Sequence, residues 1–390
     1  MTTAEKSFAL PAGDEPLPQT YARLREAGPV VPVRLPGDVP VWAVTTHAAV
    51  QEVLSGDDSR FGKHSSHWRA LRDGEVPEGW PFLPLVYGEH MLMRDGAEHR
   101  RLRALVSRDF TPGRVEALRP RIEEVVEQLV ADIAARTGTV DLIAAFAEQL
   151  PMVVICELFG IPEPERPRLR TWTQALFSHQ STPEDNHRAA TELVGYLGTL
   201  IQRKREHPED DLASAMVRGT TEERLDDREL VDSLFLMLIA GHETTVHLLG
   251  HAIVHLLADP AQLDLAVRGR RWHDVVEETL RLTPPVYGSL FRYALADTTV
   301  AGTPIAAGDA LLLCLGGAGT DPQRHGPDAA RFDLTRTQRG HLAFGHGPHF
   351  CLGAPLARLE ANVALPILFD RLSACGWRCR RSSCGTARRS

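Results

Sequence analysis

Apolar residues recur with the spacing of a helix through most of this chain. Residues three and four apart share one face of a helix, so this pattern predicts elements that bury that face. The longest such segment, 226–258, exceeds thirty residues. We expect further long helices at 112–136, 141–159, 185–206 and 354–372, and shorter ones at 17–27, 46–54, 163–178 and 273–283.

Residues 30–33 and 41–44 are predicted to be two strands with Pro36-Gly37 between them, and residues 298–314 alternate apolar residues with turns and are predicted to be β as well. Residues 62–88 follow neither pattern because they are rich in aromatic residues, proline and glycine, and we expect an irregular segment with short helices. The charged stretch 207–225 is expected to be exposed. The predicted fold class is mainly α with small β-sheets.

The composition is that of an ordinary globular protein, with 43% hydrophobic and 24% charged residues in 390 positions. No linker or internal repeat divides the chain, so we predict a single domain over residues 1–372. The net charge of −8 argues against a nucleic-acid partner. The longest apolar run, 234–240, is far too short for a membrane span, and residues 1–18 do not form a signal peptide. We therefore expect a cytoplasmic monomer without membrane contact.

The six cysteines are too scattered for a disulfide framework. Cys156 and Cys314 stand in apolar surroundings, so we expect both in the core. Cys351 lies in a glycine-rich loop directly before the helix predicted at 354–372. A helix N-terminus favours an anion and should make this thiol ionise more readily. A lone thiolate that a flat ligand can approach suggests a ligand to haem iron, whereas the alternative is a buried structural cysteine.

The loop residues form the pattern Phe344-x-x-Gly347-x-His349-x-Cys351-x-Gly353. This pattern resembles the haem-binding signature of the cytochromes P450. The resemblance implies haem b as the cofactor, with Cys351 as the metal ligand. It also implies cofactor contacts from other residues of the loop, namely Phe344, Gly345, His349 and Gly353.

The resemblance covers residues 17–372 and implies the cytochrome P450 fold. It is closest to soluble bacterial members, and residues 60–103 look most like actinobacterial members that oxidise macrolactones or steroids. It implies a haem-thiolate monooxygenase of secondary metabolism. Such an enzyme inserts one oxygen atom from O2 into a C–H or C=C bond of an apolar, medium-to-large substrate.

The long helix predicted at 226–258 contains Ala-Gly-His-Glu-Thr-Thr at residues 240–245. Glycine inside a helix costs about 1 kcal/mol relative to alanine, so it usually has a specific reason. We expect Ala240 and Gly241 to form a groove for a flat cofactor. The segment resembles the P450 motif for oxygen activation, which implies that Glu243 and Thr244 are catalytic and manage proton delivery. A bond from the threonine hydroxyl back to the preceding turn is compatible with the same geometry.

His99 and Arg103 are four residues apart and therefore share one face of a helix. Paired cations suit a dianion, and the resemblance assigns this pair to the haem propionates, together with Arg292 and His349.

Glu278 and Arg281 stand three apart on the helix predicted at 273–283. An exposed pair of this kind contributes little to stability. The resemblance implies instead a buried structural network that supports the cysteine loop, with Arg331 as its third member.

The electrons must come from outside the chain, because no Gly-x-Gly-x-x-Gly nucleotide fingerprint follows a predicted strand. The resemblance implies ferredoxin and ferredoxin reductase as partners. Ferredoxins are usually acidic, so Arg100, Arg101 and Arg358 are the candidate contacts.

Two other functions stay open. One is a haem-thiolate protein that binds or senses without turnover, against which the acid–alcohol pair argues. The other is a zinc hydrolase, because His242, Glu243 and His247 approximate the motif His-Glu-x-x-His. The second histidine stands one position too late to share the ligand face. His251 and His255 extend the row at intervals of four, and a polar helix face explains it more simply.

The sequence changes character after residue 372. Residues 373–390 contain Cys375, Cys379 and Cys384 and lack apolar periodicity. Shifted by one nucleotide, GC-rich codons for this tail can spell Val-Arg-Leu-Ala-Val-Pro-Pro-Glu-Gln-Leu, which is similar to what the resemblance leads us to expect. We therefore hypothesise a frameshifted tail in which the family's closing hairpin, one wall of the pocket, is absent.

Overall fold

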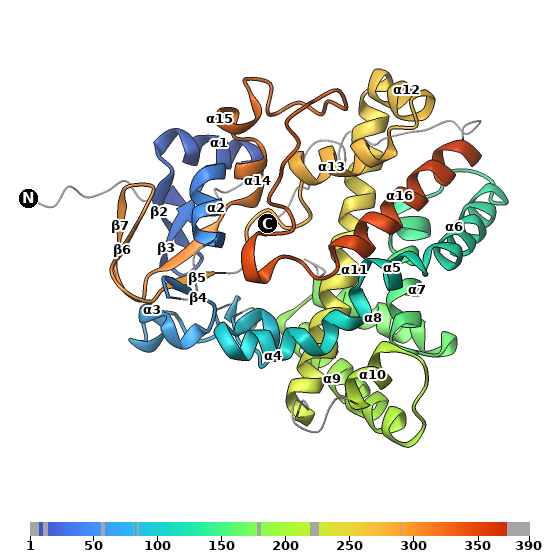
Figure 1. Cartoon of the computed structure of the whole chain (residues 1–390), viewed down its shortest axis with the longest axis horizontal. Coiled ribbons are helices and arrows are strands. Elements are labelled where there is room, and N and C mark those ends of the chain that lie inside the picture. Colours follow the sequence, from blue (N-terminus) through green and yellow to red (C-terminus); the bar gives the residue numbers. More distant parts are fainter. Residues whose placement is uncertain are drawn as a thin grey trace, which may run out of the picture.

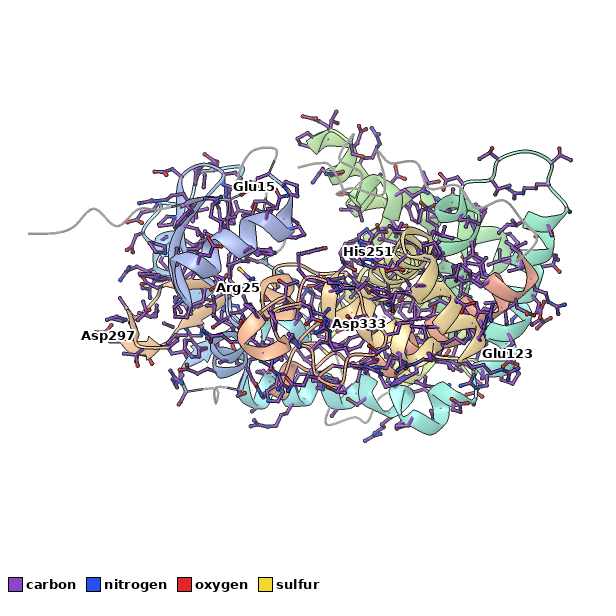
Figure 2. All side chains as sticks on the ribbon, turned by 90° about the horizontal axis from the view of Figure 1, so that it is seen from above. Glu15, Arg25, Glu123, His251, Asp297 and Asp333 are labelled. Carbon is purple, nitrogen blue, oxygen red and sulfur yellow. The ribbon has the colours of Figure 1, made fainter. Side chains whose placement is uncertain are left out.

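The computed structural model describes residues 8–10, 15–55, 59–80, 82–83, 86–177, 181–218, 226–289 and 291–372. The strands gather on one side of the molecule and most helices lie on the other (Figure 1). A view turned by 90° shows the same division, with Asp297 at the sheet end and Glu123 at the helical end (Figure 2). The predicted fold class, mainly α with small β-sheets, is confirmed.

The larger sheet has six strands, in the order β1 (Phe8–Ala9), β2 (Val30–Leu35), β3 (Val39–Val44), β8 (Ala310–Leu313), β5 (Arg292–Ala294) and β4 (Phe61–Gly62). β6 (Thr298–Val300) and β7 (Thr303–Ile305) form a separate hairpin. β8 is parallel to β3 and antiparallel to β5. The late part of the chain therefore completes a sheet that the N-terminal hairpin begins, and this sheet carries Arg292.

The helices match the predicted periodic segments in most places. Those before the long central helix are α1 (Leu17–Ala27), α2 (His47–Ser55), α3 (Arg69–Arg72), α4 (Gly96–Ser107), α5 (Pro112–Glu116), α6 (Arg119–Ala134), α7 (Gln149–Leu158), α8 (Arg166–Phe177), α9 (Pro183–Glu206) and α10 (Leu212–Arg218). The others are α11 (Asp227–Ala258), α12 (Pro260–Arg268), α13 (Trp272–Leu282), α14 (Leu315–Gly319), α15 (Pro322–His325) and α16 (Ala354–Arg371).

Helix α11 runs through the middle of the helical part (Figure 1). A capping box fixes its start, since the side chain of Asp226 accepts from the N–H of Glu229 at 2.7 Å and the side chain of Glu229 accepts from the N–H of Asp226 at 3.1 Å. Buried residues occur along its whole length because α7, α9, α13 and α16 pack around it. Of the helices in the part of the chain that the structure describes, none is both long and apolar enough to cross a membrane.

Three predicted elements differ from the structure. The helix expected at 112–136 is interrupted between α5 and α6, because Pro120 has no N–H to bond to the carbonyl of Glu116. The helix expected at 141–159 begins with a π-helical turn, Ile143–Ala147, before α7. The exposed stretch expected at 207–225 contains α10, whose apolar residues pack against α9.

The irregular segment 62–88 is anchored to the larger sheet through its aromatic residues. Trp68 and Trp80 are buried, and their ring centroids lie 5.5 Å apart. Trp68 also contacts the rings of Phe291 and Tyr293, at 5.4 and 5.8 Å. The tail at 373–390 and its cysteines lie outside the described residues, so the frameshift and the domain boundary at 372 stay hypotheses.

Candidate active site

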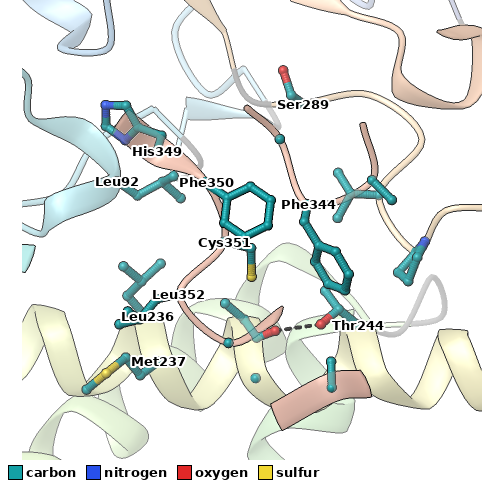
Figure 3. Close-up of a pocket in the computed structure, with 18 of the residues that line it drawn as sticks. Leu92, Leu236, Met237, Thr244, Ser289, Phe344, His349, Phe350, Cys351 and Leu352 are labelled. Atoms are coloured by element: carbon teal, nitrogen blue, oxygen red, sulfur yellow. Dashed lines mark hydrogen bonds between the residues drawn. The ribbon is translucent and has the colours of Figure 1, made fainter. Parts of the chain in front are cut away.

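A cavity of about 360 Å³ lies between α11, α16 and the loop of residues 341–353, called the cysteine loop below. Most of its wall is apolar, and Leu92, Leu236, Met237 and Leu352 surround it in Figure 3. The structure brings Cys351, Thr244 and all the predicted cofactor contacts to this one cavity: His99, Arg103, Ala240, Gly241, Arg292, Phe344, Gly345, His349 and Gly353.

The cysteine loop folds back on itself around the sulfur. The N–H of Cys351 donates to the carbonyl of Phe344 at 2.8 Å. Gly345 and Gly347 have φ of 72° and 73°, which residues with a side chain rarely adopt. At Gly347 a Cβ would also lie 2.5 Å from a backbone oxygen of Leu54. The loop therefore needs glycine here, and it leaves the Cys351 sulfur facing the cavity and α11 (Figure 3).

The thiol of Cys351 is harder to ionise than its position before α16 predicts. Burial raises its pKa. An opposite effect comes from the backbone N–H groups of Gly353 and Ala354 and from the cations of Arg103 and Arg358, but it offsets only part of this rise. The expected contribution of the helix N-terminus is present, but burial outweighs it. A metal ion in the cavity would lower the pKa of this thiol.

The other two described cysteines are structural, as predicted. Cys156 and Cys314 are fully buried, and burial raises the pKa of each thiol to about 12. Neither lines the cavity. The alternative of a buried structural cysteine therefore applies to these two and not to Cys351.

Helix α11 presents an alcohol to the cavity. Thr244 Oγ1 donates to the carbonyl of Ala240 at 2.7 Å (Figure 3), so the alternative of a bond back to the preceding turn is what the structure has. Gly241 lines the cavity, but a Cβ on it would point at Ile155 of α7, 3.3 Å away. The glycine therefore serves close packing of two helices as well as the cavity wall.

Glu243 lies beside the cavity rather than in its wall. Its carboxylate lies between two histidines, 3.8 Å from Nδ1 of His242 and 3.4 Å from Nε2 of His247. Burial raises the pKa of Glu243, and the nearby carboxylate of Glu148 raises it further. The acid is thus held next to Thr244 in a form that keeps its proton more readily than a free glutamate.

Basic side chains line one edge of the cavity. Arg103 donates to the carbonyl of Phe350 at 2.7 Å, and the rings of His99 and His349 lie 4.1 Å apart. Arg292 is only 6% exposed. Burial lowers the pKa of His349 to about 4.

Two residues of this edge were missed by the sequence analysis. Lys63 lines the cavity beside Arg292, and Asp95 lies 3.5 Å from Nε2 of His349. Burial would raise the pKa of Asp95, but the hydrogen bonds from His349 and from the backbone N–H of Lys63 lower it overall. Only the pairing of β4 with β5 brings Lys63 here, and no local pattern in the sequence reports that pairing.

The predicted network around Glu278 and Arg281 is present, but its third member is wrong. Arg336, not Arg331, places its guanidinium beside Glu278, with Nε 3.3 Å from Oε1. Arg331 contributes only its backbone carbonyl, which accepts from Arg281 at 3.0 Å, while its side chain is exposed. The turn at 333–335 reverses the chain so that the later arginine points inward, which spacing alone did not indicate.

Helix α13 also holds the cysteine loop through Glu277, which the sequence analysis missed. Glu277 accepts two hydrogen bonds from Arg358, at 2.6 and 2.9 Å, and lies 3.2 Å from Nε2 of His341. Burial would raise its pKa, but these partners lower it to about 2. Arg358, a candidate ferredoxin contact, is therefore committed to an internal ion pair.

The other two candidate contacts differ from each other. The side chain of Arg101 is 27% exposed and forms ion pairs with Glu229 and Glu98, and Arg100 is the more exposed of the two residues. Arg100 is therefore the better placed of the three to meet a partner.

The zinc alternative is wrong. His251 Nδ1 lies 2.9 Å from the carbonyl of Thr283, and His255 Nε2 lies 2.9 Å from its hydroxyl. Across the described ranges, no three histidine, cysteine, aspartate or glutamate side chains converge to hold a metal ion. The histidine row is a helix face that packs against the end of α13.

The donor set of the cavity fits one kind of ligand. A thiol projects into an apolar space, and cations cluster at one edge of it. A flat apolar group with a metal at its centre and carboxylates at one edge matches this arrangement, and haem b has these features.

Comparison with known proteins agrees with this fit. The family model described as "Cytochrome P450" matches residues 13–264 and 273–374. The chain is 43% identical to "Cytochrome P450 monooxygenase PikC" of Streptomyces venezuelae, over 92% of this chain and 84% of that protein. It is 40% identical to the mycinamicin IV hydroxylase/epoxidase of Micromonospora griseorubida, over 90% and 87%. The solved structure of testosterone-bound CYP154C4 from Streptomyces sp. ATCC 11861 matches with a TM-score of 0.88 at 39% identity, over 95% of this chain and 91% of that one.

Proposed function

The chain belongs to the cytochrome P450 family and is a P450 monooxygenase with haem b as its cofactor, and from this premise we propose its reaction. It inserts one oxygen atom from O2 into a C–H or C=C bond of an apolar, medium-to-large substrate, a macrolactone or a steroid-like molecule. The second oxygen atom leaves as water. One observation carries this proposal: the Cys351 sulfur and the Thr244 hydroxyl face the same mostly apolar cavity.

Residues of this chain would hold the cofactor at its centre, its edge and its faces. Cys351 would bind the iron through its sulfur, and haem, when bound, would supply the activation of O2. His99, Arg103, Arg292 and His349 would bind the propionates, because hydrogen bonds to a charged acceptor are stronger than neutral ones. The ring would pack against the remaining wall residues: Ala240, Gly241, Phe344, Gly345 and Gly353.

Glu243 and Thr244 would manage the protons. Thr244 Oγ1 holds its proton toward the carbonyl of Ala240, and rotation of the hydroxyl would direct it into the cavity. Glu243 would replace that proton, since a raised pKa suits a group that donates near neutral pH. His242 and His247 lie beside this carboxylate, and neither of them lines the cavity.

The apolar wall of the cavity and the similar proteins both support the proposed substrate class. Leu92, Leu236, Met237 and Val286 offer apolar surface, and such a pocket selects for size and shape more than for polar groups. Relatives at about 40% identity are named for oxidising a macrolide and vitamin D(3). A role in secondary metabolism is consistent with this class.

The electrons would come from a ferredoxin and a ferredoxin reductase, with Arg100 as the leading contact. An acidic ferredoxin would bind more weakly at high salt, because salt screens exposed charges. We place the reaction in the cytoplasm, with the enzyme acting as a monomer.

The test combines spectra with turnover. Purified holoenzyme is supplied with surrogate ferredoxin, reductase and NADPH, and macrolactones and steroids are screened by binding spectra and then by mass spectrometry under 18O2. The proposal requires a product that gains one 18O atom. Haem binding without product or NADPH use across the panel would instead support the binding or sensing alternative.

A further inference from the structure

The ammonium group of Lys63 is buried at the basic edge of the cavity. β4 pairs antiparallel with β5, with Phe61 opposite Ala294 and Gly62 opposite Tyr293. The next residue, Lys63, therefore follows the strand at the level of Arg292. Its side chain is only 4% exposed, lines the cavity and donates from Nζ to the carbonyl of Phe291 at 3.2 Å.

The backbone of Lys63 is tied to the same edge. Its N–H donates to Oδ2 of Asp95 at 2.5 Å, and Oδ1 of Asp95 lies 3.5 Å from Nε2 of His349. Asp95 precedes α4, which carries His99 and Arg103. The position of Lys63 is therefore fixed relative to the cysteine loop and to the proposed propionate contacts.

Cationic side chains outnumber carboxyl groups among the described residues that line the cavity. Lys63, Arg103 and Arg292 are three cations that line it, and among the described lining residues the one carboxyl is Glu360. Burial raises the pKa of Glu360 to about 8, so it is mostly neutral at pH 7. A wall of this composition suits an anionic ligand, because hydrogen bonds between charged groups are stronger than neutral ones.

This surplus of positive charge bears on the pKa of Lys63. Burial lowers its pKa well below the ordinary value, the positive charge of Arg292 lowers it further, and Asp95 offsets this only in part. A ligand with carboxylates at this edge would favour the charged forms of both Lys63 and Arg292. Lys63 and Arg292, at the ends of two neighbouring strands, can therefore bind one carboxylate between them.

We propose that Lys63 is a further cofactor-binding residue, which together with Arg292 binds one carboxylate of haem b. The proposal rests on the propionate edge assigned above and adds a residue to it. Its consequence is that Lys63 helps to retain haem and favours the ferrous state, because a nearby cation disfavours the loss of an electron from iron.

The test measures haem retention without substrate or redox partner, so it is independent of turnover. Holoenzyme is mixed with excess apomyoglobin, and haem transfer is followed by absorbance. For Lys63→Met we expect haem loss to be about tenfold faster than in the parent, the size of one lost charge-assisted hydrogen bond. Lys63→Arg should stay within about threefold of the parent, since it keeps the charge. The reduction potential of Lys63→Met should be lower than that of the parent.

A matched control removes a cation from the same segment outside the cavity. Arg72 is exposed and does not line the cavity, so Arg72→Met should lose haem at the parental rate. The proposal is overturned if Lys63→Met retains haem within about twofold of the parent, as it would if Lys63 bound a substrate carboxylate instead. If Lys63→Met does not fold, Lys63→Gln and Lys63→Arg decide: equal rates of haem loss in these two would overturn it as well.

Discussion

The guanidinium of Arg281 and the carboxylate of Glu278 form two parallel hydrogen bonds of 2.7 Å, and both side chains are fully buried. Arg281 also donates to the carbonyls of Gly319 and Ala329, at 2.5 and 2.7 Å. One ion pair therefore fixes two separate stretches of chain to α13. Such a pair is strongly destabilising to break, because the remaining partner is left as a buried charge.

Removal of either partner should therefore destabilise the protein by several kcal/mol. We expect Arg281→Ala and Glu278→Gln each to lower the free energy of unfolding by about 3–5 kcal/mol, measured by urea denaturation followed by circular dichroism. Arg331→Ala is the matched control, and it should change the value by less than about 0.5 kcal/mol because only its backbone takes part. Arg336→Ala should lower the free energy of unfolding by much more than Arg331→Ala does. Equal effects of these two arginines would contradict the assignment.

Local patterns in the sequence predicted those helices that bury one apolar face against the rest of the protein. α1 has the predicted bounds, α13 is shifted by one residue at each end, and α16 ends one residue before its predicted end. Periodicity failed where another constraint acts on the backbone, as at Pro120, which divides α5 from α6. The cysteine loop was recognisable because its residues are close in sequence and its glycines have a conformational reason.

The residues that were missed share a different property. Lys63, Asp95, Glu277 and Arg336 take part in the site through contacts with distant segments. Strand pairing brings Lys63 beside Arg292, and the partners of the other three are His349, Arg358 and Glu278, respectively. Nothing within a few residues of each one reports such a contact. The residue types were visible in the sequence, but the partners that give them a role were not.

Cys351 should be indispensable for turnover. Cys351→Ala and Cys351→His remove the one described thiol that faces the cavity, so we expect loss of monooxygenation and of the carbon-monoxide difference band typical of thiolate-bound haem, even where some haem is retained. Cys156→Ala is the control, because it removes a thiol from the core at 0% exposure and should keep both. Full oxidative turnover by either Cys351 variant would refute the proposed ligand.

Thr244 should couple electron use to product formation. Without its hydroxyl the proton relay from Glu243 is broken, so Thr244→Ala should still bind haem and consume NADPH, while product per NADPH falls by about tenfold or more. Thr244→Ser keeps the hydroxyl and should restore most of the yield. Product and NADPH are measured in the same reaction. The relay is wrong if the alanine variant couples as tightly as the parent.

Glu360 should make the fold less stable as the pH rises. It lies on α16 at 2% exposure, and its Oε2 has no hydrogen-bond partner within the described residues. Burial raises its pKa from the ordinary 4.5 to about 8. Between these values the unfolded chain has released the proton and the folded chain still holds it. The contribution of Glu360 to stability is therefore fully present below about pH 4.5 and is lost by about 1.4 kcal/mol per pH unit as the pH rises toward about 8.

Glu360→Gln keeps the shape of the side chain without an ionisable proton, so it should remove this slope. Parent and variant should have similar free energies of unfolding near about pH 4.5, and the variant should be the more stable by several kcal/mol near about pH 8. Urea denaturation at intervals across this range measures both slopes. The same substitution at Glu123, an exposed glutamate at the far end of the helical part (Figure 2), should leave the parental slope unchanged. If Glu360→Gln and the parent lose stability in parallel as the pH rises, the buried carboxyl is ionised in the folded protein and another group must compensate its charge.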